Sequence, residues 1–259
     1  FKQKGKAVVR WLDRAKTTAD DLVENEKGNP VLLFHVCTRT LSAYVGVRGE
    51  VDPEPAVTTA VEVGERLIAS ARDPGRKTQL QWELGTALYD AVQIYQMRSE
   101  NDKALKYGQA AADYLAEAMR DNPASAASLL LGRLYFRLGA IHSLGNRDHK
   151  AAVVWFDKAL PLLDGKSAEE VADNLGRHGE SLVSMGVSYW QIGQREKAVE
   201  LTEKGIRWME QAVRQGSLDR STLSVPYENL AAMHRKLGND EKAERLQQLA
   251  GRIKEEMLK

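Results

Sequence analysis

The sequence predicts an all-α protein of about eleven helices, arranged as a leading helix followed by five antiparallel pairs. Three observations lead to this prediction: an alanine that returns at near-constant spacing, apolar residues at helical spacing between these alanines, and turn-forming residues where helices should end. No segment alternates polar and apolar residues for long enough to predict a strand. Because two helices alone cannot bury their apolar faces, we expect each pair to stack on the next.

The repeat is clearest at the Lys-Ala pairs, whose alanines are separated by 97, 47, 47 and 45 residues. The long gap holds Pro55-Ala56 near its middle. An aromatic residue or a histidine stands nine residues before four of the alanines, at Tyr95, His142, Tyr189 and His234. The spacing therefore predicts a repeat of 45 to 49 residues. The pairs are Lys6-Ala7, Lys103-Ala104, Lys150-Ala151, Lys197-Ala198 and Lys242-Ala243.

Turn and capping residues divide the chain into the expected elements. The leading helix is predicted over 1–25, and the helix pairs over 30–72, 76–121, 123–164, 167–215 and 219–258. Capping side chains stand before prolines suited to the first helical turn at Asn29-Pro30, Asp52-Pro53, Asp73-Pro74 and Asn122-Pro123. Helix exits are predicted at Lys27-Gly28, Asp164-Gly165 and Gln215-Gly216.

The packing inside a pair follows from residue size. Small residues such as Ala104, Ala198 and Gly186 are predicted where two backbones approach closely. Large residues are expected to fill the space between pairs, namely Trp11, Phe156 and Tyr189.

The two ends of the array differ. The last helix has one apolar stripe and one charged face, which is typical of a capping helix. The leading helix has the pattern of a second helix of a pair, yet no first helix precedes it. We therefore expect the chain, which begins at Phe1, to be a piece of a longer protein; the alternative is that this helix is itself a cap. Its apolar stripe at Ala7, Val8 and Trp11 also suggests a homo-oligomer formed through this helix.

These features resemble the tetratricopeptide repeat (TPR). The fourth pair carries the resemblance best, with Met185-Gly186 and Tyr189 in its first helix, Gly193 at the turn and Ala198 in its second helix. The fifth pair repeats it with Leu230-Ala231, His234, Gly238 and Ala243. In the second pair Ser99 stands where the turn glycine is expected, and the third pair, with Gly145, Ala152 and Phe156, fits after a one-residue insertion. The first pair fits poorly.

The resemblance implies a right-handed superhelical solenoid in which first helices line a concave groove. The common TPR unit has about 34 residues, so the longer unit here implies longer helices and a wider groove. The positions matching the groove include Thr86 and the partner-binding candidates, which are Tyr89, Gln93, Gln96, Arg133, Phe136, Trp190, Gln191, Arg235 and Lys236. The lysine, asparagine and arginine pattern with which some TPR domains hold a chaperone's C-terminal carboxylate is absent from these positions.

No catalytic or metal-binding motif is found. The chain has no Gly-rich phosphate loop, no HExxH motif and no Gly-x-Ser-x-Gly motif. The single cysteine, Cys37, is predicted to be a small buried hydrophobic residue, and His35 a core or groove residue. We predict no enzyme activity, no cofactor and no metal site.

Net charge and hydropathy restrict the classes of partner that the chain can bind. A formal charge of +1 gives no broad basic surface for nucleic acid, and no apolar run is long enough to span a membrane. The low cysteine content favours the cytoplasm but also fits many bacterial extracytoplasmic proteins. The leading hypothesis is a protein-interaction scaffold that binds a peptide or helical segment in its groove. The alternatives are the sensor or docking region of a larger bacterial signalling enzyme, such as a serine/threonine kinase, and a self-association module.

Overall fold

The computed structural model describes residues 2–24, 29–47, 51–120, 125–164 and 175–257. In these ranges the chain forms eleven α-helices and no β-strand. The prediction of an all-α helical-repeat fold is therefore confirmed. None of the helices in the described ranges is long and apolar enough to cross a bilayer.

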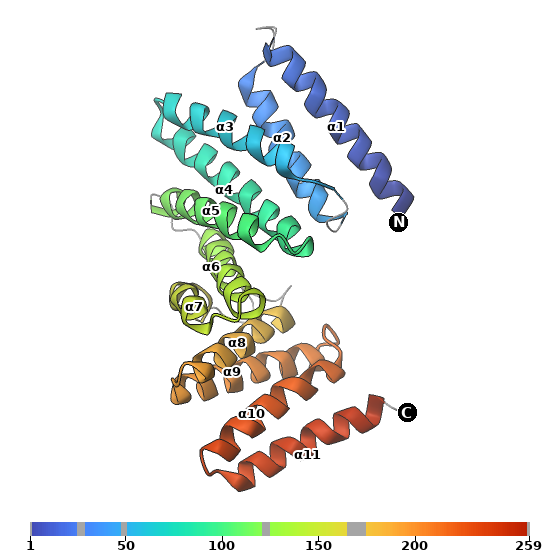
Figure 1. The fold of residues 1–259 in the computed structure, drawn as a ribbon, viewed down its shortest axis with the longest axis vertical. Helices are drawn as coiled ribbons and strands as arrows, with labels where there is room; N and C mark the ends of the chain where they lie inside the picture. Colours follow the sequence, from blue (N-terminus) through green and yellow to red (C-terminus); the bar gives the residue numbers. More distant parts are fainter. Residues whose placement is uncertain (1, 25–28, 48–50, 121–124, 165–174, 258–259) are drawn as a thin grey trace. The chain divides into compact units, whose positions relative to one another are not determined.

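The chain divides into two compact units, 1–134 and 135–259, and each is described by itself. In unit 1, α2 packs against α1, α3 and α4, and α4 packs along α5 (Figure 1). In unit 2, α8 packs along α9, and α10 along α11. The helices of unit 1 are α1 (Lys2–Glu24), α2 (Pro30–Val45), α3 (Glu54–Ser70), α4 (Pro74–Met97) and α5 (Asn101–Arg120). The unit boundary lies within α6 (Ser125–Ala140), which is followed by η1 (Ile141–Gly145), α7 (His149–Leu163), α8 (Leu175–Gln191), α9 (Arg195–Arg214), η3 (Arg220–Leu223), α10 (Ser224–Lys236) and α11 (Asp240–Met257).

Side-chain caps fix where several helices begin. Asn29 Oδ1 accepts a hydrogen bond from the Val31 N–H at 2.9 Å, directly before Pro30. Asp73 Oδ2 accepts one from the Arg76 N–H at 2.7 Å, so α4 begins at Pro74, two residues before the predicted range. The expected punctuation at Lys27-Gly28, Asn122-Pro123 and Gly165 lies outside the described residues.

The turns between first and second helices share one backbone geometry. The residue at the turn has a positive φ at Ser99 (61°), Gly193 (88°) and Gly238 (77°). The next N–H then donates to the carbonyl of the aromatic residue or histidine in the last turn: Glu100 to Tyr95, Gln194 to Tyr189 and Asn239 to His234, at 2.9 to 3.0 Å. This is the bond pattern of a Schellman helix end. Ser99 thus has the backbone conformation of the glycines whose place it takes.

The third pair departs from this pattern by one residue. The closing bond runs from the Asp148 N–H to the His142 carbonyl at 2.9 Å, one residue longer than in the other pairs. The π-helix η1 absorbs the extra residue. As a result the positive φ falls on Arg147 (54°) rather than on Gly145. The fully buried alanine is Ala152, the residue that the predicted one-residue insertion places in the repeat, whereas Ala151 of the Lys-Ala series is partly exposed.

The core of unit 1 forms where α2, α3 and α4 meet. A Cβ atom on Gly64 would lie 2.8 Å from Phe34 Cε2 and 3.1 Å from Leu84 Cδ2, so only glycine allows α3 to pack this closely. Cys37 of α2 is also fully buried, as predicted. Burial raises the pKa of its thiol to about 11, which keeps the thiol protonated.

The core of unit 2 contains a direct contact between two helix backbones. A Cβ atom on Gly179 of α8 would lie 2.5 Å from the Gly205 carbonyl oxygen of α9, and a Cβ atom on Gly205 would meet the Gly179 oxygen at the same distance. The predicted close approach at Gly186 is also present, against Thr202 and Ala198. Phe156 and Tyr189 are fully buried, as expected.

The leading helix α1 packs on α2 through one face only. Tyr44 Oη of α2 donates a 2.6 Å hydrogen bond to Asp13 Oδ1. Trp11 lies on another face of α1 and is 69% exposed, so the prediction that it fills an interior space was wrong. Two apolar stripes run along this helix, and the sequence pattern alone did not show which one α2 covers.

Candidate functional site

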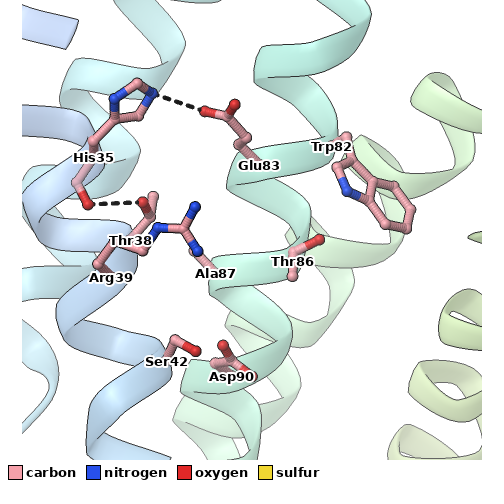
Figure 2. Close-up of a pocket in the computed structure, with 9 residues that line it drawn as sticks. All are labelled: His35, Thr38, Arg39, Ser42, Trp82, Glu83, Thr86, Ala87 and Asp90. Carbon is pink, nitrogen blue, oxygen red and sulfur yellow. Dashed lines mark hydrogen bonds and ion pairs between the residues drawn. The ribbon is translucent and has the colours of Figure 1, made fainter. Parts of the chain in front are cut away.

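A cleft of about 330 Å³ lies between two first helices of unit 1, α2 and α4. Figure 2 shows the side chains that line it, most of which lie between the two helices. Most of them are polar or charged. From α2 they are His35, Thr38, Arg39 and Ser42, and from α4 they are Trp82, Glu83, Thr86, Ala87 and Asp90.

One end of the cleft is held by a chain of hydrogen bonds. His35 Nε2 lies 3.2 Å from Glu83 Oε2, which ties α2 to α4. The other carboxylate oxygen of Glu83 accepts a hydrogen bond from Gln79 Nε2 at 2.8 Å. Gln79 Oε1 in turn accepts one from Arg76 Nη1 at 3.0 Å. Both oxygens of Glu83 are therefore engaged within the protein.

Arg39 is the central cation of the cleft. Its guanidinium group extends from α2 into the space facing Ala87 (Figure 2). Among the residues that the structure describes, Arg39 forms no hydrogen bond or ion pair. Glu83 is committed to His35, and Asp90 accepts a hydrogen bond from Gln93 Nε2 at 3.2 Å. Arg39 can therefore offer its N–H donors to a ligand.

Thr86 and Trp82 extend the lining on α4. The Thr86 hydroxyl oxygen is buried and has no hydrogen-bond partner within the described ranges. An unsatisfied buried hydroxyl costs free energy, so a ligand group that bonds to it would recover some of that cost. The Trp82 ring projects from the side of α4 that faces away from α2 (Figure 2).

Three other polar clusters have a structural role, since each joins neighbouring helices around a carboxylate. In unit 1, Glu54 of α3 accepts hydrogen bonds from Tyr95 at 2.8 Å and Tyr107 at 2.7 Å, and pairs with Lys103 at 2.9 Å. Burial raises the pKa of Glu54, but the bonds from Tyr107, Lys103 and Tyr95 outweigh it and lower the pKa to about 2. Its oxygens are fully used.

The corresponding clusters of unit 2 are smaller. Asp157 of α7 accepts hydrogen bonds from Tyr189 at 2.7 Å and Lys197 at 2.8 Å. Burial raises its pKa, and the bonds from Lys197 and Tyr189 lower it further than burial raises it. Glu203 of α9 pairs with Lys242 at 2.6 Å and lies 3.6 Å from His234 Nε2. In all three clusters the lysine belongs to a Lys-Ala pair.

The predicted groove residues of unit 1 lie beside the cleft rather than in its lining. Gln93 is linked to the lining of the cleft, because its side-chain amide donates a hydrogen bond to Asp90. Tyr89 and Gln96 are partly buried on α4, and Arg133 is partly buried on α6. Thr86 is the one sequence-derived groove position of α4 that lines the cleft.

Of the predicted groove residues in unit 2, the two aromatic ones pack against neighbouring side chains and the three polar ones are exposed to solvent. The Phe136 ring stacks on the buried Phe156 ring, with centroids 5.8 Å apart. Trp190 packs against the core cluster of unit 2, and the guanidinium carbon of Arg195 lies 4.0 Å from its ring centroid. The other candidates, Gln191, Arg235 and Lys236, are exposed at the C-terminal ends of α8 and α10.

Sequence reasoning did not identify most of the cleft. Arg39, Ser42 and Glu83 were not singled out, and His35 was predicted only as a core or groove residue. The available signal was the first pair, but its fit to the repeat was too poor to place positions of α2. In the described part of the chain, no group of three or more histidine, cysteine, aspartate or glutamate residues is arranged to hold a metal ion.

No protein-family model and no curated protein sequence matches the chain. Solved structures do match it. The structure of BtubC (BKLC) from P. vanneervenii is 18% identical in sequence, with a TM-score of 0.61 over 98% of this chain and 92% of that one. The apo form of RapI is 14% identical, with a TM-score of 0.55 over 86% of this chain and 71% of that one.

Both matches cover most of this chain, and what they show is a shared fold. The protein has a TPR-like helical-repeat fold, as the sequence resemblance implied. At such low identity the role of each neighbour belongs to that neighbour alone.

Proposed function

We propose that the protein is an interaction scaffold that binds a protein segment on its first helices, with the cleft between α2 and α4 as one binding site. The observation that carries this proposal is Arg39, a cation directed into a cleft where the nearby carboxylate Glu83 is already bonded to His35 and Gln79. Hydrogen bonds between a guanidinium and a carboxylate are among the stronger polar contacts in proteins.

The arrangement of charges favours a particular kind of segment. Arg39 suits an acidic side chain or a carbonyl oxygen, whereas the nearby carboxylates Glu83 and Asp90, which are bonded within the protein, disfavour a second negative charge on the segment. Thr86 adds a hydroxyl that can bond to a backbone group. The best fit is an extended segment with one acidic residue flanked by residues that carry no negative charge.

The remaining groove candidates extend this proposal. Tyr89, Gln93, Gln96 and Arg133 are proposed to contact the same segment beyond the cleft in unit 1. In unit 2, Phe136, Trp190, Gln191, Arg235 and Lys236 are proposed as a further contact surface. Aromatic and arginine side chains often dominate the binding energy of protein interfaces.

The test begins with selection of short random peptides on the immobilised chain, followed by calorimetry on the enriched sequences. We expect the enriched peptides to share an aspartate or glutamate. Arg39→Ala should weaken their binding about 10- to 100-fold, which corresponds to the loss of a charged hydrogen bond. The matched control is Arg66→Ala, because Arg66 is an exposed arginine on the second helix α3 of the same unit.

A charge exchange makes the test specific. Arg39→Glu should abolish binding of the acidic peptide and restore binding when the acidic residue of the peptide is replaced by lysine. Equal binding by the Arg39→Ala variant and the unmodified chain would refute the assignment of the site. Enrichment of no peptide at all would contradict the proposed function itself.

A further inference from the structure

The cleft between α2 and α4 is built from matching positions of two consecutive repeats. His35 lies 48 residues before Glu83, the residue that it contacts. The same offset relates Arg39 to Ala87. Arg39 therefore faces an alanine (Figure 2), and the carboxylates Glu83 and Asp90 lie about one turn before and after that alanine on α4.

Arg39 nevertheless forms no ion pair or hydrogen bond within the described ranges. The reason lies in the contacts of Glu83. Its Oε2 is 3.2 Å from His35 Nε2, and its Oε1 accepts a 2.8 Å hydrogen bond from Gln79 Nε2. Because a carboxylate only accepts hydrogen bonds, His35 Nε2 is assigned as the donor. Both oxygens of Glu83 thus have a donor other than Arg39.

His35 provides the contact on which this arrangement depends. Gln79 lies one turn before Glu83 on the same helix and engages only one of its oxygens. Without the imidazole the other oxygen would lose its donor. Arg39, the one arginine or lysine of α2, lies one turn after His35. Since guanidinium–carboxylate hydrogen bonds are stronger than those of neutral groups, Glu83 would then turn to Arg39 and neutralise it.

We propose that His35 is a positioning residue of the peptide-binding cleft, a role that rests on the function proposed for Arg39. By holding Glu83, His35 keeps the guanidinium of Arg39 open to an acidic residue of the bound segment. Glu83 is in turn a built-in competitor for the same guanidinium, because it and the acidic residue of the segment are both carboxylates.

Calorimetry of the selected acidic peptides on four chains tests this role: the unmodified chain, His35→Ala, Glu83→Gln and the double variant. His35→Ala should weaken binding about fivefold, because the peptide must displace Glu83 from Arg39. Glu83→Gln alone should strengthen binding about twofold, because a nearby negative charge is removed. The double variant should bind as tightly as Glu83→Gln, since no carboxylate remains there to compete. A fivefold loss that persists in the double variant would overturn the proposal, because His35 would then act on the peptide directly.

Two further variants separate positioning from a general structural role. His35→Gln places an amide N–H where the imidazole Nε2 lies, so it should retain binding to within about twofold. The matched control is His149→Ala, because His149 also joins two helices, α7 and α8, through a 3.1 Å hydrogen bond to Ser188. It should leave binding unchanged. Equal losses in His35→Gln and His35→Ala, or an equal loss in His149→Ala, would contradict the proposal.

Crystal structures of the unliganded variants read the same contact without a peptide. In His35→Ala, Glu83 Oε2 should lie within hydrogen-bond distance of the Arg39 guanidinium, and in His35→Gln it should not. Peptide binding without this movement in His35→Ala would overturn the positioning role alone. Selection of no peptide would refute the binding site and the role of His35 together, even where Glu83 moves.

Discussion

The pairs α4–α5 in unit 1 and α8–α9 in unit 2 follow the same plan but are held together differently. In α8–α9 the backbones touch, since Gly179 and Gly205 face each other's carbonyl oxygen. In α4–α5 the closest contact is to a side chain, because a Cβ atom on Gly85 would lie 2.7 Å from Leu115 Cγ and 3.2 Å from the Leu115 backbone nitrogen. The α8–α9 interface depends on two glycines that lack a side chain, whereas the α4–α5 interface depends on how the Leu115 side chain fits against Gly85.

The polar clusters that hold these pairs also differ, and the larger of the two belongs to α4–α5. Glu54 joins two tyrosines and Lys103 around unit 1, whereas Asp157 joins Tyr189 and Lys197 in unit 2. The pair whose closest contact is to a side chain thus has the larger polar cluster. The comparison shows that one repeat plan can be stabilised mainly by backbone packing or mainly by a shared carboxylate.

The largest difference is expected from adding a methyl group at the two glycine contacts. Gly205→Ala should destabilise the protein by about 2–3 kcal/mol, because the new Cβ meets a backbone oxygen that cannot move without shifting α8. Gly85→Ala should cost less, about 1–2 kcal/mol, because the closest atoms belong to the Leu115 side chain, with the Leu115 backbone nitrogen farther away at 3.2 Å. Urea unfolding followed by circular dichroism would measure both. Equal losses would show that the backbone contact has no special role.

Removing the shared carboxylates should give the next largest effect. Glu54→Ala should cost about 2 kcal/mol, because Tyr95 and Tyr107 both lose their acceptor and Tyr95 is fully buried. Asp157→Ala should cost about 1 kcal/mol, since only one buried hydroxyl, that of Tyr189, loses its acceptor, while Lys197 remains solvated. The free energies of unfolding from denaturant titrations decide the order, and a larger loss at Asp157 would contradict it.

The same carboxylate predicts how stability depends on pH. The folded-state pKa of Glu54 is about 2, below its ordinary value of 4.5. Its contribution to stability is therefore present above the ordinary pKa and is lost as the pH falls toward 2. The unfolding midpoint in urea should decline between pH ~5 and ~2, and the decline should be shallower in Glu54→Gln. An unchanged slope in that variant would show that other carboxyl groups cause the acid sensitivity.

The smallest effect is expected at the turns. Ser99 has a positive φ that glycine adopts without strain, so Ser99→Gly should stabilise unit 1 by about 0.5–1 kcal/mol. Gly193→Ser, the reverse change in α8–α9, should destabilise unit 2 by a similar amount. Thermal unfolding would compare the two. A loss of stability in Ser99→Gly would mean that the serine side chain has a role beyond the turn.

The sequence predicted those features that recur at fixed positions. The buried alanines, the aromatic row and the turns at Gly193 and Gly238 follow from local periodicity. The carboxylates do not, because Glu54 lies 41 residues before Tyr95 and Asp157 lies 32 residues before Tyr189. These partners come from a preceding helix whose register varies between repeats.

The candidate site was less predictable than the fold. Thr86 was identified through its place in the repeat, but Arg39 lies on α2, whose pair matched the repeat poorly. Arg39 is a candidate because Glu83 bonds to His35 and Gln79 rather than to it. This arrangement depends on three-dimensional neighbours and has no signature in residue spacing.

The buried position of Cys37 provides a reporter that is confined to one unit. It is the chain's single cysteine, and it lies in the core of unit 1 as a protonated thiol that reacts slowly with alkylating reagents. Modification therefore requires α2 to open, and its rate under native conditions reads the opening free energy of that region. Alkylation kinetics can separate a loosening of unit 1 from one of unit 2, which a single global unfolding curve merges.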